Sequence, residues 1–463
     1  MKNNNSKIYL FETMPVPKAL ATMAIPTIIS QLINLIYNIV DTFYIGQTGN
    51  SYMVAGVTVA FTIFMMTVSF SNLFGVGGGS LMSRLSGQGE FQRAKQVCAL
   101  SFYGAIAIAL AYSLLIGFLM TPILNLLGAS EDTILYARQY TWVVVVAGNL
   151  PIILSMSLAH LLRNAGFSTQ ASIGLSGGGI LNIILDPLFM FVLLPKGSEV
   201  LGAAIATLLS NVASAVYLLL ILKKESKNAP VSLSFKDMCR TPKEDVRGLF
   251  KVGIPSAILV GLFDVANIFL NALMSVHGDL QLAAIGIVQK AERVPTAINI
   301  GLAQGMLPIV AYNYSSGNHK RMKSVINTTR VVGLTIAFAC VALYLLFASQ
   351  IAGVFLSVSA SDASASVATV GFAATFLTFR CCASPFQFLN YSTSYTLQAM
   401  ADGRDTLLHA FVREFVFYVP FMYLFNHLWG ASGLAVALPA GELCGGLFAL
   451  LLLSRLMKRQ NIQ

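Results

Sequence analysis

The residues of this sequence that could do chemistry are carboxylates that stand inside apolar runs. Asp41 lies 23 residues into the run 18–43, and Asp186 lies 15 residues into the run 171–194. An ionised carboxylate in hydrocarbon costs about 2.5–3.5 kcal/mol on insertion scales, so such residues are usually retained for function. Both runs are expected to cross a membrane in the same direction, which would bring the two carboxylates to similar depths.

Three polar side chains could join this pair. Asn182 precedes Asp186 by one helical turn on the same face, Tyr37 precedes Asp41 in the same way, and Thr207 could add a hydroxyl from the next run. Oxygen ligands of this kind suit a hard cation such as sodium, or a shared proton. They predict a cation or proton site at Asp41, Asn182, Asp186 and Thr207, with Tyr37 nearby. The alternative is that both carboxylates are structural hydrogen-bond acceptors.

The charges around this pair favour the first interpretation. No Lys or Arg lies deep in the first six apolar runs, and Arg138 comes nearest, at the outer end of the fourth run. Two carboxylates without a fixed countercharge repel each other unless a mobile cation or a proton sits between them. We therefore expect an exchangeable ion in this half of the chain.

The second half carries a different set of charges at membrane depth. Four are basic and four acidic: Asp264, Lys290, Glu292, Arg293, Arg380, Arg413, Glu414 and Glu442. A balanced set can pair internally, which predicts a locked polar network. Within it, Asp264, Lys290, Glu292 and Arg293 are the candidates for a substrate-facing group. Asp264 is the exception to watch, because it occupies nearly the place in the seventh run that an ion site would need.

The elements that must position these residues are membrane helices. Of 463 residues, 56% are hydrophobic and 10% charged, whereas a soluble domain carries about 25% charged residues. Runs of about 20 apolar residues, each able to span a bilayer core of roughly 30 Å, recur along the chain. They predict an all-α integral membrane protein with twelve transmembrane helices at 18–43, 52–83, 98–119, 133–161, 171–194, 200–222, 249–275, 282–312, 331–350, 365–397, 407–426 and 431–454.

The basic residues predict the orientation of these helices. The chain ends and the even-numbered links hold 23 of the 29 Lys and Arg residues, and the opposite face keeps only Arg138 and Lys196. By the positive-inside rule, both termini and the link 223–248 are expected to be cytoplasmic. The first apolar run is followed by no small-residue cleavage site, so it is expected to stay as the first span.

An internal repeat divides the chain into two lobes. Ala24-Ile25-Pro26 matches Gly253-Ile254-Pro255 at an offset of 229, and further glycines pair at offsets within a few residues of this value. The repeats predict two pseudo-symmetric six-helix lobes, at 1–222 and 249–463, joined by the cytoplasmic linker 223–248. Parallel repeats of this kind hold a substrate between two rocking lobes, which is the architecture of a carrier.

Other functional classes find little support. Gly75-Val-Gly-Gly-Gly-Ser80 lacks the spacing of a phosphate loop and sits in an apolar run, which favours close helix packing or a hinge. The six cysteines and five histidines show no metal-ligand spacing. No nucleotide-binding domain and no nucleophile–base constellation is recognisable. We expect no cofactor, no nucleotide or nucleic-acid partner, and no enzymatic activity.

Several motifs resemble those of one transporter family. The run from Tyr37 through Asp41 to Gly46-Gln-Thr-Gly49, the Gly87-Gln-Gly-Glu90 segment, Asn182-x-x-x-Asp186-Pro187 and Leu201-Gly-Ala-Ala-x-Ala-Thr207 are similar to multidrug and toxic compound extrusion (MATE) transporters. The resemblance covers nearly the whole chain and is nearest to a bacterial branch that couples through the N-terminal lobe. It implies an outward-facing V of two lobes in the bacterial cytoplasmic membrane. It also implies export of hydrophobic, often cationic, drug-like compounds in exchange for sodium ions or protons.

The resemblance implies the same coupling residues that the charges indicate: Asp41, Asn182, Asp186 and Thr207, with Tyr37 nearby. It further suggests a monomer in contact with membrane lipids. A branch of the family that couples through the second lobe uses an acid in the seventh span, roughly matched by Asp264. Its further acid in the tenth span has no counterpart, since 365–397 contains no Asp or Glu.

One alternative function remains within the same superfamily. A flippase for lipid-linked oligosaccharides would need unpaired basic residues in the central cavity to hold a pyrophosphate. The basic residues at membrane depth are matched by acids, so drug export is the favoured hypothesis.

Overall fold

The computed structural model describes residues 9–357, 363–460 and 462, and these are almost entirely helical, with no β-strand among them. The first half of the chain contains α2 (Val16–Gly46), α3 (Ser51–Gly87), α4 (Phe91–Leu126), α5 (Ile134–Thr141), η1 (Trp142–Ala147), α6 (Asn149–Asn164), α7 (Ser168–Pro187), η2 (Leu188–Leu193) and α8 (Glu199–Glu225). The short helix α9 (Phe235–Cys239) lies in the link. The second half contains α10 (Lys243–Ser275), α11 (Asp279–Ser315), α12 (His319–Leu346), α13 (Ala348–Ser357), α14 (Ala363–Arg380), η3 (Cys381–Ala383), α15 (Ser384–Ala399), α16 (Gly403–Phe411), η4 (Val412–Tyr418), α17 (Val419–Trp429) and α18 (Ala431–Arg459).

Most of the predicted spans are single apolar helices. Ten helical segments of the described residues are long and apolar enough to cross a membrane, and an eleventh is the pair Ile134–Ala147 and Asn149–Asn164, bent by 54°. The predicted run 365–397 is divided at η3 into α14 and α15. Pro385 stands at the start of α15, where its missing N–H costs nothing, so the chain can change direction there.

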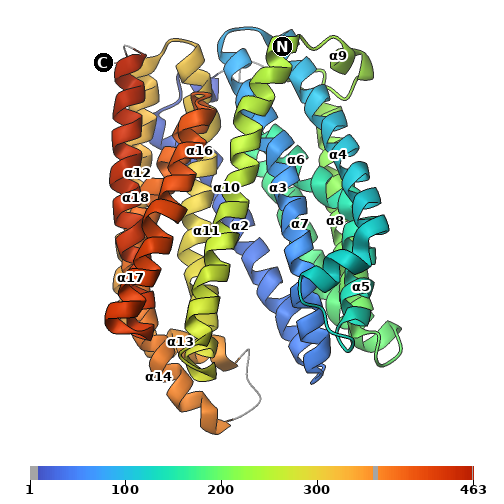
Figure 1. The fold of residues 1–463 in the computed structure, drawn as a ribbon. Helices are drawn as coiled ribbons and strands as arrows, with labels where there is room; N and C mark the ends of the chain where they lie inside the picture. Colours follow the sequence, from blue (N-terminus) through green and yellow to red (C-terminus); the bar gives the residue numbers. More distant parts are fainter. Residues whose placement is uncertain (1–8, 358–362, 461, 463) are drawn as a thin grey trace.

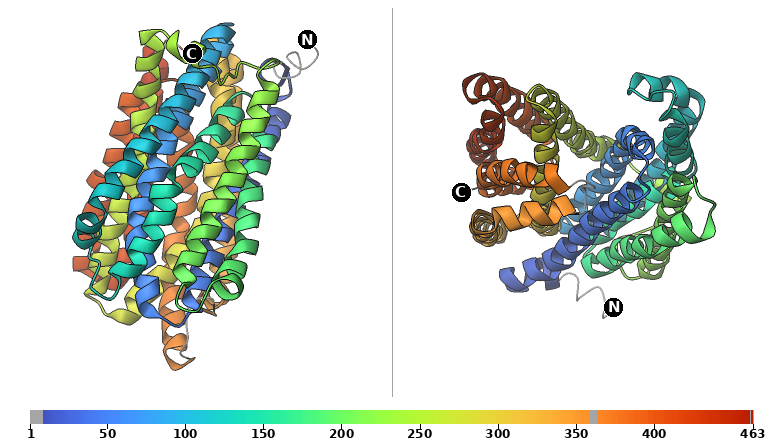
Figure 2. Two further views of the ribbon diagram at one scale, coloured as in Figure 1. Left: turned by 90° about the vertical axis from the view of Figure 1, so that its right-hand side faces the viewer. Right: turned by 90° about the horizontal axis from the view of Figure 1, so that it is seen from below.

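The helices form two lobes. Seen along the bundle from below, the helices of the first half and those of the second half lie in two groups (Figure 2). The chain ends and α9 lie at one end of the molecule, which we call the terminal end, and α13 and α14 lie at the other (Figure 1). Large apolar side chains such as Phe118 and Leu126 point outward with 83% and 86% of their surface exposed. An apolar exterior of this kind suits lipid.

Glycine contacts close the terminal end between the lobes. Gly77 of α3 lies against α10, where a Cβ would come within 2.7 Å of the carbonyl oxygen of Leu249. Gly305 of α11 lies against α2, where a Cβ would come within 2.5 Å of the Cα of Ala24. Because α2 corresponds to α10 and α3 to α11 in the repeat, these two interfaces are pseudo-symmetric copies. The repeat predicted from sequence is therefore visible in the packing between the lobes.

The glycines of α3 also pack within the first lobe. A Cβ on Gly75 would lie 3.0 Å from the His160 side chain, and one on Gly79 would lie 2.5 Å from Nδ2 of Asn164. The close packing predicted for the segment Gly75–Ser80 is confirmed. These small residues leave room for the side chains of α6 to pack directly on α3, as small residues allow close helix contacts in membranes.

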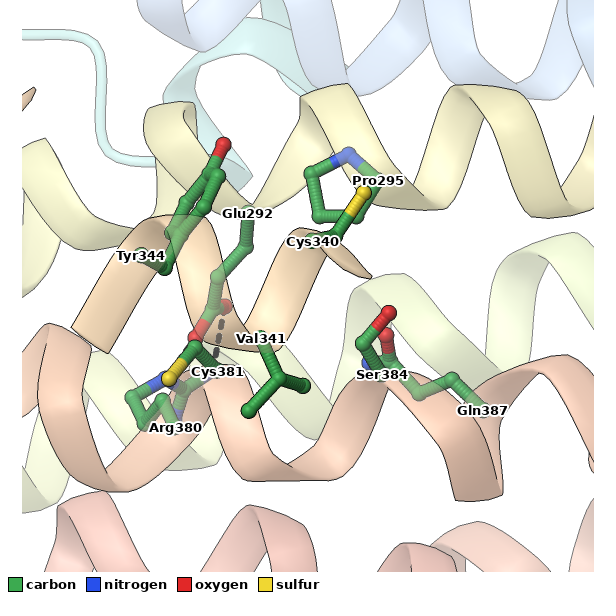
Figure 3. Close-up of a pocket in the computed structure, with 9 residues that line it drawn as sticks. All are labelled: Glu292, Pro295, Cys340, Val341, Tyr344, Arg380, Cys381, Ser384 and Gln387. Carbon is green, nitrogen blue, oxygen red and sulfur yellow. Dashed lines mark hydrogen bonds and ion pairs between the residues drawn. The ribbon is translucent and has the colours of Figure 1, made fainter. Parts of the chain in front are cut away.

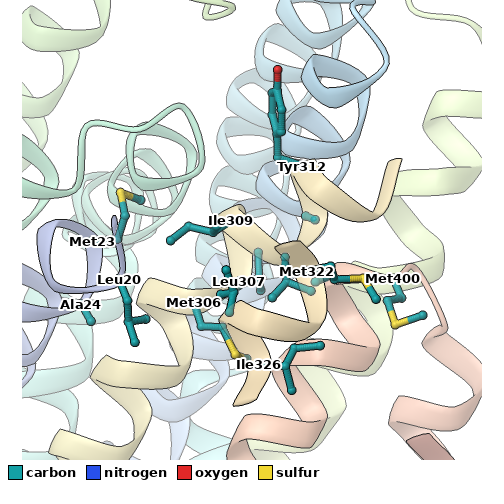
Figure 4. Close-up of a cluster of buried hydrophobic side chains, with 14 of the residues drawn as sticks. Leu20, Met23, Ala24, Met306, Leu307, Ile309, Tyr312, Met322, Ile326 and Met400 are labelled. Carbon is teal, nitrogen blue, oxygen red and sulfur yellow. The ribbon is translucent and has the colours of Figure 1, made fainter. Parts of the chain in front are cut away.

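The helix α2 passes from one lobe to the other. Its N-terminal residues Leu20, Met23 and Ala24 join a buried apolar cluster with α11 and α12 (Figure 4). Its later residues pack on α7, where a Cβ on Gly179 would lie 3.1 Å from Ile33. The helix continues through Pro26, which lies between these two regions. One helix thus contacts the cores of both lobes.

The chain before α2 is attached to the second lobe. The Arg321 side chain donates to the backbone oxygens of Phe11 and Met14, each at 2.7 Å, and Asn313 Nδ2 donates to Phe11 at 3.0 Å. Leu10 and Phe11 are buried in the same cluster. This segment was assigned to the first lobe from sequence, and it packs on helices of the second.

We expect Gly253→Ala to destabilise the fold by about 1–3 kcal/mol, the usual effect of overpacking. A Cβ at Gly253 would strike the backbone oxygen of Leu73 on α3, which cannot move aside like a side chain. Gly261→Ala, on the same helix α10 with nothing within 4 Å, should be neutral or stabilising by about 0.5–1 kcal/mol. Denaturation of the purified protein measures both, and equal effects would contradict the packing described.

Candidate functional site

A polar site lies in the first lobe where α7 meets α8. The Asn182 Nδ2 donates to Asp186 Oδ1 at 3.1 Å and to Thr207 Oγ1 at 3.4 Å. Asp186 is completely buried, and Asn182 and Thr207 are 2% and 5% exposed. The structure thus brings together three of the residues selected from sequence, and Asn182 links the carboxylate to the hydroxyl.

Glycines on two faces of α7 position this site between its neighbours. A Cβ on Gly178 would strike Ser214 Oγ on α8, and one on Gly179 would lie 3.4 Å from the Tyr37 ring on α2. The absence of side chains at both positions lets α8 and α2 approach two adjacent faces of α7. This arrangement brings Asp41 and Tyr37 of α2 to the same region as Asp186, close enough that the charges of the two carboxylates interact.

Three oxygen atoms of the site have no hydrogen-bond donor among the described residues. They are Asp41 Oδ1, Asn182 Oδ1 and Asp186 Oδ2, each shielded from solvent. No Lys, Arg or His of the described chain forms an ion pair with either carboxylate. A buried polar atom without a partner is uncommon in folded proteins. Carboxylate and amide oxygens of this kind are the ligands that a hard cation prefers.

Sequence reasoning missed one neighbour of this site. Tyr140 of α5 is 4% exposed, interacts with Thr207, and lies near Asp41 and Asp186. Its position in the fourth predicted span carries no sequence signal, because a tyrosine in an apolar run is common. The described residues hold no group of three or more His, Cys, Asp or Glu that could bind a metal. The site therefore depends on amide and hydroxyl oxygens beside its two carboxylates.

A cavity of about 540 Å³ lies between the lobes. Its wall combines amide groups, aromatic rings, methionines and charged groups from both lobes, including Gln31, Asn34, Asn38, Met65, Asn72, Met156, His160, Arg163, Phe263, Asp264, Asn267, Glu292, Arg293, Gln304, Arg380, Tyr391, Tyr395, Gln398 and Arg413. The volume is within the usual range of small-molecule sites. The cavity and the polar site share α2, since Asn38 lines the cavity and Asp41 stands one turn further along.

Most charges of the second lobe pair with each other. Arg380 binds both oxygens of Glu292 at 2.6 and 2.9 Å, in a small pocket lined also by Tyr344 (Figure 3). Arg413 binds both oxygens of Glu442 at 3.0 and 2.5 Å. These bidentate pairs hold α14 to α11 and η4 to α18, as fork-to-fork hydrogen bonds do.

The four substrate-facing candidates of this lobe are placed differently. Glu292 is held by Arg380, whereas Asp264 and Arg293 line the cavity without an ion pair within 4 Å among the described residues. Asp264 Oδ2 has no hydrogen-bond donor there. Lys290 lies on α11 one turn before Arg293 and is not part of the cavity wall.

Arg163 has a role that its sequence position hid. The sequence places it in a cytoplasmic link, yet it stands in the last turn of α6, is only 2% exposed, and lines the cavity. Its Nη1 donates to Gln304 Oε1 of α11 at 3.3 Å. It is therefore a contact between the lobes at the closed end of the cavity.

Comparison with known proteins identifies the chain. The MatE family model matches residues 26–188 and again residues 255–424. The two matched ranges start 229 residues apart, at Pro26 and Pro255, which is the offset of the internal repeat. The chain belongs to the MatE family. It is a multi-pass membrane transporter built from two related lobes.

Relatives of this MatE protein align along its full length. It is 29% identical over 458 residues to Multidrug export protein MepA of Staphylococcus saprophyticus, covering 99% of this chain and 98% of the relative. The protein of the same name from Staphylococcus aureus strain MRSA252 is also 29% identical over 458 residues, with the same coverage.

Solved structures share the fold of this MatE protein. A crystal structure of MATE in complex with MaL6 has a TM-score of 0.90 at 23% identity, covering 97% of this chain and 99% of that one. An outward-facing multidrug resistance MATE transporter of the MOP superfamily has a TM-score of 0.89 at 23% identity, covering 97% and 98%. These likenesses extend over both lobes and concern the fold alone.

We expect Arg380→Met to destabilise the protein by about 3–5 kcal/mol, because Glu292 would keep its charge in a buried site without a partner. The double variant Arg380→Met with Glu292→Leu removes both charges and should recover most of that loss. Denaturation of the two purified variants and the wild type provides the measurement. A double variant as unstable as the single one would show that packing, and not charge, dominates this contact.

Proposed function

We propose that this chain is a secondary active multidrug exporter that exchanges hydrophobic, often cationic, organic compounds for sodium ions or protons. The family and the name of its full-length relatives, multidrug export protein, support the transport of drugs. The cavity between the lobes supplies a place for the substrate, with amide, aromatic and charged groups in its wall. Compounds of varied shape can adapt to such a mixed lining, in part through flexible methionines.

The observation that carries the coupling proposal is the set of unpaired oxygens in the first lobe. Asp41, Asn182 and Asp186 each direct one buried oxygen that has no donor among the described residues. A sodium ion would be held by these oxygens together with Thr207, and a proton would be shared by the two carboxylates. Tyr37 and Tyr140 border the site and would limit the access of water. The ion is a transported substrate here, so no resident cofactor is required.

Coupling would pass through α2. This helix carries Asp41 on the side of the ion site and Asn38 on the wall of the cavity. An ion that draws Asp41 toward Asp186 changes the position of α2 and therefore the shape of the cavity. Thermodynamic linkage requires that the substrate then alters the affinity for the ion by the same factor.

The direction of transport follows from the orientation. Most basic residues lie in segments at the terminal end, where the lobes are closed, so this end is assigned to the cytoplasm by the positive-inside rule. The structure would then be outward-facing, with both termini cytoplasmic. We place the protein in the bacterial cytoplasmic membrane, surrounded by lipid, as a monomer.

A flippase for lipid-linked oligosaccharides is the alternative. One observation favours it, namely that Arg163 faces the cavity without an acidic partner. Against it, the full-length relatives are named as multidrug export proteins. Binding of anionic lipid-linked sugars, without binding of any organic cation, would favour the flippase.

We expect cells that lack their own pumps to export ethidium when they express this protein, and Asp186→Asn to lower the rate at least about tenfold. The amide cannot supply the charge that binds a cation or the proton that would be exchanged. Asp132→Asn changes an exposed acid of the same lobe and should export at the wild-type rate. Repeating the assay with and without sodium identifies the ion.

The outcomes separate the parts of this proposal. Export by Asp186→Asn at the wild-type rate and equal expression would reject coupling at this site. No export by the wild type would reject ethidium-type drug export and leave the transporter fold intact.

A further inference from the structure

The closed end of the cavity contains a buried cation whose charge the protein does not balance. Arg163 stands in the last turn of α6, is 2% exposed and lines the cavity. Every other deeply buried arginine near the cavity has an acidic partner, since Arg380 binds Glu292 and Arg413 binds Glu442. Arg163 forms no ion pair with a carboxylate of the described residues.

The groups that do contact Arg163 are neutral. Its Nη1 donates to Gln304 Oε1 at 3.3 Å and lies 3.4 Å from His160 Nδ1, and its Nε has no partner among the described residues. The same Gln304 oxygen also accepts from Gln31 Nε2 at 3.2 Å, so it is shared between two donors. Amide oxygens satisfy part of the hydrogen-bonding capacity of the guanidinium and none of its charge.

The nearest acid on the cavity wall without a partner is too far away to balance it. Asp264 lies near Arg293, which precedes Gln304 on α11 by three helical turns. At 1.5 Å per residue, Arg293 and Gln304 are about 16 Å apart along α11. Asp264 and Arg293 therefore lie together nearer the open end of the cavity, and neither reaches Arg163 at its closed end.

A buried guanidinium without an anion is costly, and it is the group best shaped to bind a carboxylate through two parallel hydrogen bonds. We infer that Arg163 is an anion-binding subsite, and that the substrates include amphiphilic compounds carrying a carboxylate, which Arg163 receives at the closed end of the cavity. This inference rests on the proposed function, since it assigns a substrate class to the same cavity.

The position of the subsite also gives it a role in the cycle. Arg163 and Gln304 come from different lobes, and their contact must break when the closed end opens. A carboxylate bound to Arg163 competes with Gln304 for the guanidinium. Substrates with a carboxylate are therefore expected to weaken the contact that holds this end closed.

The test compares two dyes that differ only at the charged group. A rhodamine with a free carboxylate and the methyl ester of the same rhodamine share one cationic ring system. Their binding to the purified full-length protein in detergent is measured by fluorescence polarisation, for the wild type, Arg163→Gln and Arg138→Gln. Arg138 is exposed in the same lobe and does not line the cavity, so its variant is the control for loss of a positive charge.

We expect Arg163→Gln to raise the Kd of the carboxylate dye about tenfold or more and to change the Kd of the ester less than twofold. Arg138→Gln should change neither. In the wild type, benzoate in excess should displace the carboxylate dye at concentrations that leave the ester bound. This competition needs no variant, so it still tests for a carboxylate subsite if Arg163→Gln does not fold.

Three results would overturn the inference in distinguishable ways. If Arg163→Gln raised the Kd of both dyes equally, Arg163 would be only a contact between the lobes. Binding of the ester and not of the carboxylate dye by the wild type would reject the anion subsite and keep the proposed drug cavity. Binding of neither dye by the wild type would reject both proposals.

Discussion

The contact of backbones between α3 and α10, and between α2 and α11, is the constraint on which this structure depends. Glycine at 77, 253 and 305 lets these helices approach more closely than any side chain would allow. Because the two interfaces are related by the internal repeat, they close the same end of the molecule together. The lobes can then diverge toward the other end, and the cavity lies between them.

The two lobes differ in whether their buried charged groups have partners. The second lobe pairs Arg380 and Arg413 with carboxylates on other helices, which holds α14 to α11 and η4 to α18. The first lobe instead leaves carboxylate and amide oxygens without donors beside α2. The same helix continues into the core of the second lobe at the terminal end. A change at the polar site can therefore reach both the cavity and the contact between the lobes.

Much of this arrangement could be predicted from the sequence, because membrane helices must be long and apolar, and charges inside them are conspicuous. The position of Asp186 and Asn182 on one helix face followed from their spacing of four residues. The break at Cys381 could not be found by hydropathy, since α14 and α15 are continuous in composition. The burial of Arg163 was missed because a basic residue at the end of a span usually faces water. The role of Tyr140 depends on packing between distant segments, which a single sequence does not contain.

The bidentate pairs of the second lobe have an electrical consequence. A membrane potential acts on every net charge that moves across it, at about 2.3 kcal/mol per elementary charge for each 100 mV. The pair of Arg413 and Glu442 and the pair of Arg380 and Glu292 each sum to zero, so moving them through the field requires no electrical work. The voltage dependence of the cycle would then be set by the ion at the first lobe, by the charge of the compound in the cavity, and by charged groups of the cavity wall without an ion pair among the described residues, such as Arg163, Asp264 and Arg293.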